Sequence, residues 1–280
     1  MTRRTRFTTR PPLLQALALL FLLPAFLATT AAPQSAYKVI QVEHGATVVG
    51  TVRWEGPVPK LPQLPITKNS DICDPDSRKT INLDRLEISS SGAVSDAVVY
   101  LKNISAGKAM DLPEMRQHLD QEHCRYVPHI FIVPQGTAFQ LKSSDPILHT
   151  VHMSGAANAN VPFPFQNQFV SVNLPRPGVV DLKCNAGHVW MNAEVLVVDH
   201  PYYAVTSADG SFQLSDIPAG DYEIEVWHEG WKILREESVL DVAAQTMVRR
   251  PIYSAPLTWS KKVVLSQGES AQVNFAIGEK

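Results

Sequence analysis

The chain has 280 residues, of which 45% are hydrophobic, and its formal net charge is −2 at pH 7. This length accommodates one large domain or two modest ones. The balanced charge argues against a nucleic-acid partner, because nucleic-acid-binding domains concentrate positive charge.

The first 32 residues predict a secretory signal peptide. Four arginines within the first ten residues precede an apolar run, Leu13–Leu27, and small residues continue to Ala32. This is the order of a signal peptide, and the apolar run is too short to span a membrane comfortably. Cleavage removes four of the 25 basic residues and none of the 27 acidic ones, which leaves a net charge of about −6. We therefore expect a periplasmic or secreted protein without a stable membrane span after cleavage.

Beyond the signal, the pattern is β almost throughout. Short runs rich in Val, Ile, Tyr and Phe are separated by Gly, Pro, Asn and Asp. Four prolines between residues 57 and 65 predict an irregular excursion over 55–95, and a helical turn is predicted at Leu112–Leu119. The predicted strands before residue 200 are Tyr37–Val42, Thr47–Trp54, Ala97–Asn103, His129–Val133, Ala138–Lys142, Phe169–Asn173, Gly178–Lys183 and Ala193–Val198.

A domain boundary is predicted near Asp199. The Asp209-Gly210 turn lies between two short predicted strands, and a second turn leads into an alternating strand that ends at Trp227. Two further runs, Lys262–Leu265 and Ala271–Ile277, flank a polar turn. Residues 200–280 therefore predict a second, small β-sandwich, so the expected fold is all-β with two β-sandwich domains.

Four residues carry the chemistry of this sequence. Cys184, His188 and Met191 lie within eight residues, and His149 lies upstream. One thiolate, two imidazoles and one thioether are the ligand set of a blue-copper electron-transfer site. A single Cys, His or Met is more often structural, but all four occur in this order on a β-rich exported chain. His152 is the alternative to His149, although it would face the opposite side of a strand.

Missing motifs narrow the class of metal protein. No Cys-x-x-Cys-His motif attaches a c-type haem, and no His-Glu-x-x-His motif indicates a zinc protease. The metal loop holds no second Cys for a binuclear copper centre, and no His flanks Cys184 as in multicopper oxidases. We therefore expect one mononuclear copper and no enzymatic activity.

The three cysteines need an arrangement that suits an exported protein. A disulfide between Cys73 and Cys124 would leave Cys184 as a thiolate, which metal ligation would protect from oxidation. The alternative is a second metal site that uses Cys124 with His123 or His129.

Residues 126–199 resemble a cupredoxin, and most closely the amicyanin and plastocyanin branch. The resemblance rests on Asp-Pro-Ile-Leu-His-Thr-Val-His (145–152) and Cys-Asn-Ala-Gly-His-Val-Trp-Met (184–191). It implies a Greek-key sandwich, which we extend over residues 37–199, and a type 1 copper with Met191 as the axial ligand. Two departures stand out: Thr150 replaces the usual Asn after the first His, and three residues instead of two separate Cys184 from His188.

The resemblance also implies where electrons pass. In this fold the ring edge of the second ligand His lies nearest the surface, so His188 is the expected port. Val189, Trp190 and the Val-Pro-Phe-Pro-Phe segment (161–165) would form an apolar docking patch around it. The alternative is that Phe163 and Phe165 pack inward. The expected partner is a redox protein such as a c-type cytochrome or a periplasmic dehydrogenase.

Residues 200–280 resemble a carboxypeptidase regulatory-like (transthyretin-like) domain. The motifs are Asp-Gly-Ser-Phe (209–212) and Ile-Pro-Ala-Gly-Asp-Tyr (217–222). Together, the two domains are similar to exported bacterial proteins labelled methylamine-utilisation-like. The expected function is single-electron transfer through copper. Two alternatives remain open: a periplasmic copper-binding or trafficking protein, and a structural β-sandwich protein with a vestigial site.

Overall fold

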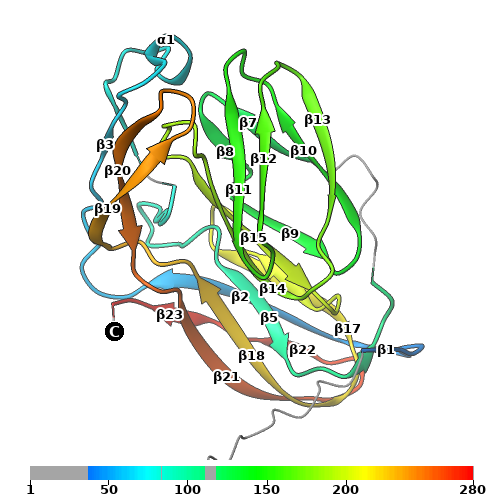
Figure 1. Ribbon diagram of the computed structural model, residues 1–280. Helices are drawn as coiled ribbons and strands as arrows, with labels where there is room; N and C mark the ends of the chain where they lie inside the picture. The colour runs from blue at the N-terminus through cyan, green and yellow to red at the C-terminus, as the bar shows by residue number, and fades with distance from the viewer. Residues whose placement is uncertain (1–36, 83, 111–117, 280) are drawn as a thin grey trace, which may run out of the picture. The chain divides into compact units, whose positions relative to one another are not determined.

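The computed structural model describes residues 37–82, 84–110 and 118–279 (Figure 1). The predicted signal peptide lies outside these residues, as does most of the predicted helical turn at Leu112–Leu119. The described chain is almost entirely β, with one short helix. Within these ranges no helix combines the length and the apolar character needed to cross a membrane.

The first β-sandwich lies between residues 118 and 198. One sheet has the strand order β12-β11-β14-β15-β9, and the other has the order β13-β10-β7-β8. Side chains from both sheets share a single core, in which Leu141, Val151 and Leu182 are fully buried. The strands are β7 (His118–Glu122), β8 (Arg125–Val127), β9 (Ile130–Pro134), β10 (Ala138–Ser143), β11 (His149–Gly155), β12 (Ala159–Phe163), β13 (Gln168–Asn173), β14 (Gly178–Lys183) and β15 (Asn192–Val198).

The second β-sandwich draws its strands from both ends of the described chain. One sheet has the order β16-β5-β18-β21, and the other has the order β17-β2-β22 with β23 also pairing with β2. The strands are β2 (Ala46–Trp54), β5 (Val98–Lys102), β16 (Tyr203–Val205), β17 (Ser211–Ile217), β18 (Gly220–His228), β21 (Leu257–Leu265), β22 (Ser270–Gln272) and β23 (Phe275–Ile277). This sandwich has its own buried core.

The pairing of β2 and β5 corrects the expected extent of the first sandwich. We expected residues 37–103 to complete the cupredoxin sheet, but β5 lies between β16 and β18, and β2 pairs with β17, β22 and β23. The buried face of β2, which includes Val48 and Val52, packs in the same core as Phe212 and Phe275. Alternation in a strand indicates which face is buried but not which sheet the strand joins. The strands of the first sandwich therefore end before residue 199, but the first sandwich does not begin at residue 37.

The predicted irregular excursion is present between β2 and β5. Its regular elements are a short strand pair, β3 (Leu64–Pro65) with β4 (Thr80–Ile81), and helix α1 (Ser70–Cys73). A disulfide joins Cys73, at the end of α1, to Cys124 between β7 and β8. The expected disulfide is therefore present, and it holds the excursion against the first sandwich. Cys124 is not available to the alternative metal site, and His129 instead pairs with Glu229. Outside the excursion, a further short parallel pair joins β1 (Lys38–Val39), before β2, to β6 (Ala106–Gly107), after β5.

A two-stranded hairpin projects from the second sandwich. It consists of β19 (Ile233–Asp241) and β20 (Thr246–Tyr253), which pair only with each other among the described strands. Its turn reaches the segment between β14 and β15, where the backbone N–H of Val242 donates a 2.9 Å hydrogen bond to the carbonyl of Asn185. In Figure 1 this hairpin (orange) runs beside the excursion that carries α1. This hairpin is not among the strands predicted from the sequence.

A buried ionic cluster links the two sandwiches. Arg85, from the excursion, lies 2.6 Å from a carboxylate oxygen of Glu229, which follows β18, and 3.6 Å from one of Glu194 on β15. Burial raises the pKa of Glu194 to about 9, and the negative charges of Asp181 and Glu229 add to this effect more than Arg85 offsets it. Glu194 is therefore protonated at neutral pH in the folded chain.

We predict that Glu194→Gln reduces the pH dependence of stability. Between the ordinary carboxyl pKa near 4.5 and the folded value of about 9, the folded chain keeps a proton that the unfolded chain has lost. The contribution of Glu194 to the free energy of unfolding is therefore fully present below about pH 4.5. It falls as the pH rises, by at most about 1.4 kcal/mol per pH unit. Urea unfolding at pH 5.5, 7 and 8.5 should show a smaller decline for Glu194→Gln than for the unmodified chain. Glu55→Gln, at an exposed position, is the control, and equal declines in all three proteins would contradict the prediction.

Candidate metal centre

Three of the four predicted ligands lie at strand ends on one edge of the first sandwich. His149 begins β11, Cys184 follows β14 directly, and His188 lies in the loop that leads to β15. Gly187 makes this loop possible because its φ is +87°, a conformation that residues with a Cβ rarely adopt. A Cβ at this position would also lie 2.2 Å from a carboxylate oxygen of Asp241.

The imidazoles of His149 and His188 present the same ring atom to the sulfur of Cys184. The Nδ1 of His149 lies 3.9 Å from the Cys184 Sγ, and the Nδ1 of His188 lies 3.6 Å from it. All three residues are buried, and their donor atoms lie within 4.8 Å of one another. A single ion could therefore contact one sulfur and two nitrogens, as the sequence predicted.

Met191 and His152 lie nearby but outside this group of three donors. Met191 is buried in the same core, and its backbone N–H donates a 3.0 Å hydrogen bond to the carbonyl of His188. Its role as the axial ligand stays a prediction. His152 is partly exposed and lies an odd number of residues from His149, so it faces the other side of β11.

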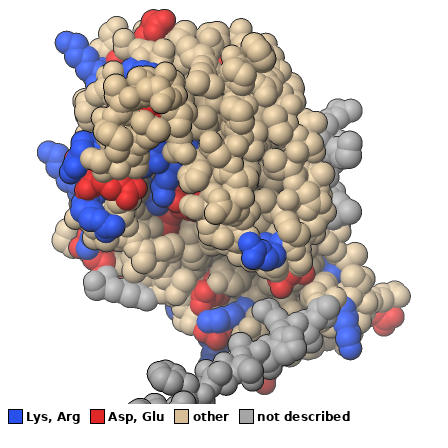
Figure 2. Space-filling model, in the orientation of Figure 1, with Lys and Arg blue, Asp and Glu red and all other residues tan. Residues whose placement is uncertain are grey.

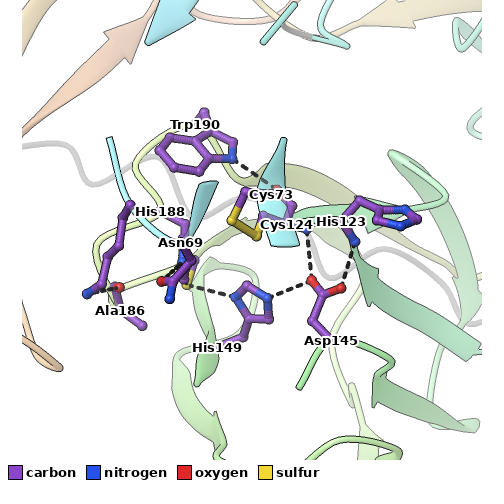
Figure 3. The surroundings of a disulfide bond; sticks show 11 residues. Asn69, Cys73, His123, Cys124, Asp145, His149, Ala186, His188 and Trp190 are labelled. Carbon is purple, nitrogen blue, oxygen red and sulfur yellow. Dashed lines mark hydrogen bonds and ion pairs between the residues drawn. A yellow bond between two sulfur atoms is a disulfide. The ribbon is translucent and has the colours of Figure 1, made fainter. Parts of the chain in front are cut away.

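Both histidine rings are held from their far side. The Nε2 of His149 donates to Asp145 at 2.9 Å, and the Nε2 of His188 donates to Asn69 at 3.0 Å (Figure 3). Asp145 also accepts hydrogen bonds of 2.8 Å from the backbone N–H groups of His123 and Cys124. Because each Nε2 donates to these partners, each Nδ1 faces the sulfur and offers a lone pair to a metal once it releases its proton. Asp145 begins the sequence motif that contains His149, but no local signal in the sequence connects Asn69 with the site.

Thr150 links the two ligand-bearing segments. Its hydroxyl accepts a 2.7 Å hydrogen bond from the backbone N–H of Asn185 and faces the Cys184 sulfur, as a donor, at 3.9 Å. The hydroxyl thus makes two contacts at the position where the sequence resemblance leads one to expect Asn. Although residue 150 is Thr and not Asn, its side chain still connects β11 to the segment that follows β14.

The predicted surface port is covered. His188 is only 1% exposed and Trp190 only 3% exposed, so neither forms an apolar surface patch. Phe163 is fully buried, whereas Phe165 is 71% exposed. The expectation of an exposed His188 edge is therefore wrong for this chain, because the excursion between β2 and β5 and the β19–β20 hairpin contact the loop.

Two segments provide the cover. From the excursion, Lys68 donates to the carbonyl of Ala186 at 2.8 Å and pairs with Asp241 of the hairpin at 2.6 Å. From β20, Arg250 donates to the carbonyl of Cys184 at 2.6 Å and to the side chain of Asn185 at 3.1 Å. Arg250 is buried, so these contacts replace its hydration.

The electrostatics of the metal-free chain favour a thiolate. Burial alone would raise the pKa of Cys184, but hydrogen bonds and positive charge from His149 and His188 outweigh it and lower the pKa to about 5. Burial acts to lower the pKa of His149, but Asp145 and the Cys184 sulfur raise it to about 9. The thiolate is the form of cysteine that binds metal.

Comparisons with known proteins reach separate parts of the chain. A family model described as the second β-sandwich domain of BOS complex subunit NOMO1-like proteins matches residues 199–251. No curated protein matches the chain. The methylamine-utilisation resemblance therefore stays a prediction.

Among solved structures, the chain is similar to copper proteins over about a third of its length. A reduced amicyanin variant is 21% identical over 31% of this chain and 87% of that one, with a TM-score of 0.27. A purple cupredoxin from Nitrosopumilus maritimus is 20% identical over 26% and 81%, with a TM-score of 0.24. A copper-containing nitrite reductase from Thermus scotoductus is 16% identical over 32%, with a TM-score of 0.29, and the chain spans about a quarter of that protein. The case for a metal at this site therefore rests on the donor atoms.

We predict that Thr150→Val weakens copper binding by about 10- to 100-fold without unfolding the protein. Valine has nearly the shape of threonine but loses the bonds to Asn185 and Cys184, and such supporting bonds typically contribute that much to metal affinity. Competition with a chromogenic copper chelator measures the change. Thr246→Val, at an exposed position, should bind copper as the unmodified chain does. Equal affinity in both variants would contradict the prediction.

Proposed function

We propose that this chain carries single electrons through one copper ion held by His149, Cys184 and His188, with Met191 as the fourth ligand. The observation that supports this most directly is the convergence of two Nδ1 atoms on one buried sulfur. Sulfur and two imidazoles with a weak thioether are the ligands of type 1 copper. Copper bound there would supply one-electron exchange.

The surrounding residues limit movement of the donors. Asp145 and Asn69 hold the two rings, Thr150 holds the strand ends together, and Arg250 holds the carbonyl of Cys184. Donors that are already in place need little rearrangement when the charge of the site changes, which favours fast electron exchange. The burial of all three donors also keeps water and small substrates from the site, in line with a carrier that is not an enzyme.

The cellular setting belongs to the same proposal. The N-terminal sequence favours export, and a disulfide such as Cys73–Cys124 is typical of proteins in oxidising compartments. A periplasmic or secreted carrier would exchange electrons with a redox protein, such as a c-type cytochrome or a dehydrogenase.

The burial of His188 favours a second candidate, copper binding or trafficking without a redox partner. A carrier needs a short path from its metal to a partner, and the covered ring of His188 lengthens that path. Stopped-flow mixing of the reduced copper-loaded chain with an oxidised c-type cytochrome separates the two: exchange within seconds supports the carrier, and its absence supports trafficking.

Loading with Cu(II) tests the metal site itself. We expect an intense blue colour that is lost in Cys184→Ser and in His149→Ala, because each variant removes one donor of the group of three. His44→Ala, at an exposed position, is the matched control and should stay blue. Far-UV circular dichroism confirms that each variant is folded. A colourless unmodified chain, or colour that survives in Cys184→Ser, would contradict the proposal.

We predict that Arg250→Gln lowers the reduction potential of the copper-loaded chain. A buried cation beside the ligand loop stabilises the reduced site, which carries one positive charge less. At an effective dielectric constant near 20 the loss is about 1–2 kcal/mol, on the order of 40–80 mV for one electron. Arg249→Gln is the control because Arg249 is exposed and pairs with Glu236. Cyclic voltammetry of both variants measures the difference, and equal potentials would contradict the prediction.

A further inference from the structure

The Cys73–Cys124 disulfide lies directly against the proposed copper ligands. The sulfurs of Cys73 and Cys124 and a ring nitrogen of His188 lie within 4.8 Å of one another, and all three residues are buried. Cys124 also forms a close group with Asp145 and His149. Figure 3 shows the disulfide in the same group of side chains as His188, His149 and Asp145. The bond therefore links two segments of the chain, and its sulfurs belong to a group of side chains that could hold a metal.

The oxidation state of this bond decides what its sulfurs can bind. As a disulfide, neither sulfur is a thiolate, and thiolates are the cysteine form that ligates metals. Two electrons and two protons convert the bond into two thiols, and each thiol releases its proton on binding a metal. Two thiolates and an imidazole form a soft donor set, which selects Cu(I).

A reductant has a route to the bond. Cys73 lines a cavity of about 820 Å³, together with polar side chains that include Arg78, Glu122 and His123. Cys124 is fully buried, so attack would occur at the Cys73 sulfur, whose residue is 5% exposed. The thiol that leaves, Cys124, would then lie within reach of His188.

We propose that reduction of the Cys73–Cys124 disulfide by a dithiol creates a second metal site, in which Cys73, Cys124 and His188 hold Cu(I). The dithiol becomes a disulfide as it supplies the two electrons and two protons. The second site shares His188 with the blue-copper site but does not use Cys184. It therefore stands whether or not the proposed electron transfer is correct. A reduced chain would hold Cu(I) in this soft site.

The test uses the Cys184→Ser chain, which lacks the sulfur of the first site. The chain is prepared with its disulfide intact or after reduction and anaerobic removal of the reductant, and Cu(I) is titrated against a chromogenic chelator. We expect the reduced chain to retain one Cu(I) and the disulfide form to retain none. Adding His188→Ala should weaken retention by about tenfold or more, whereas His123→Ala, an exposed histidine beside Cys124, should leave it unchanged.

The histidine variants separate a built site from two loose thiols. If reduction unfolds the chain, the thiols bind Cu(I) equally with and without His188, and that result overturns the proposal. Equal retention by the reduced and disulfide forms also overturns it. A blue unmodified chain whose reduced Cys184→Ser variant retains no Cu(I) rejects the second site alone. A colourless unmodified chain with His188-dependent Cu(I) retention rejects the electron carrier alone.

Discussion

The antiparallel pairing of β11 with β14 is the constraint on which the site depends. The register sets His152 opposite Lys183, so the residues beyond this pair, Thr150 and Asn185, meet at the edge where β14 ends. His149 and Cys184 then lie on neighbouring strand ends with their donor atoms 3.9 Å apart. A slip of one residue would turn the side chains of one strand to its other face and separate the sulfur from the imidazole. The core of the first sandwich holds that register, since Val151 and Leu182 are fully buried in it and Met153 is almost fully buried.

Burial of this edge strengthens the electrostatic interactions between the Cys184 sulfur and the groups that face it. A thiolate in an apolar core is costly unless positive charge or hydrogen-bond donors surround it. Here two imidazoles face the sulfur, Thr150 points its hydroxyl toward it, and Arg250 binds the carbonyl of the same residue. The chain thus stabilises a negatively charged ligand before any metal binds. The cover that buries the site comes from the excursion and the hairpin, so the site depends on both sandwiches.

The way the two sandwiches share the chain explains this dependence. β2 and β5 enter the second sandwich before the first one begins, and the excursion between them returns to the first through Cys73 and Arg85. The hairpin β19–β20 leaves the second sandwich to meet the ligand loop. A chain threaded in this way cannot separate its two sandwiches without exposing the loop that carries Cys184 and His188, which gives the second sandwich a structural role in the candidate site.

The sequence alone determined the fold class, most strands, the disulfide and the group of His149, Cys184 and His188. The strands follow from local alternation, and the closeness of Cys184 to His188 follows from the short loop that carries both residues. The Cys73–Cys124 pairing followed from the count of three cysteines, and His149 was identified from the order of the ligand residues and the resemblance of its motif. The tertiary structure alone decided that β2 and β5 join the second sandwich, that β19–β20 forms a hairpin over the loop, and that Asn69 and Arg250 contact the site. The alternation of a strand shows which face is buried but does not indicate which strand it pairs with. Asn69 lies 119 residues from His188 and Arg250 lies 66 from Cys184, so only the folded chain brings each pair together. The prediction of an exposed His188 ring edge was wrong for the same reason. The residues that cover the ring are distant in sequence and become its neighbours only in the folded chain.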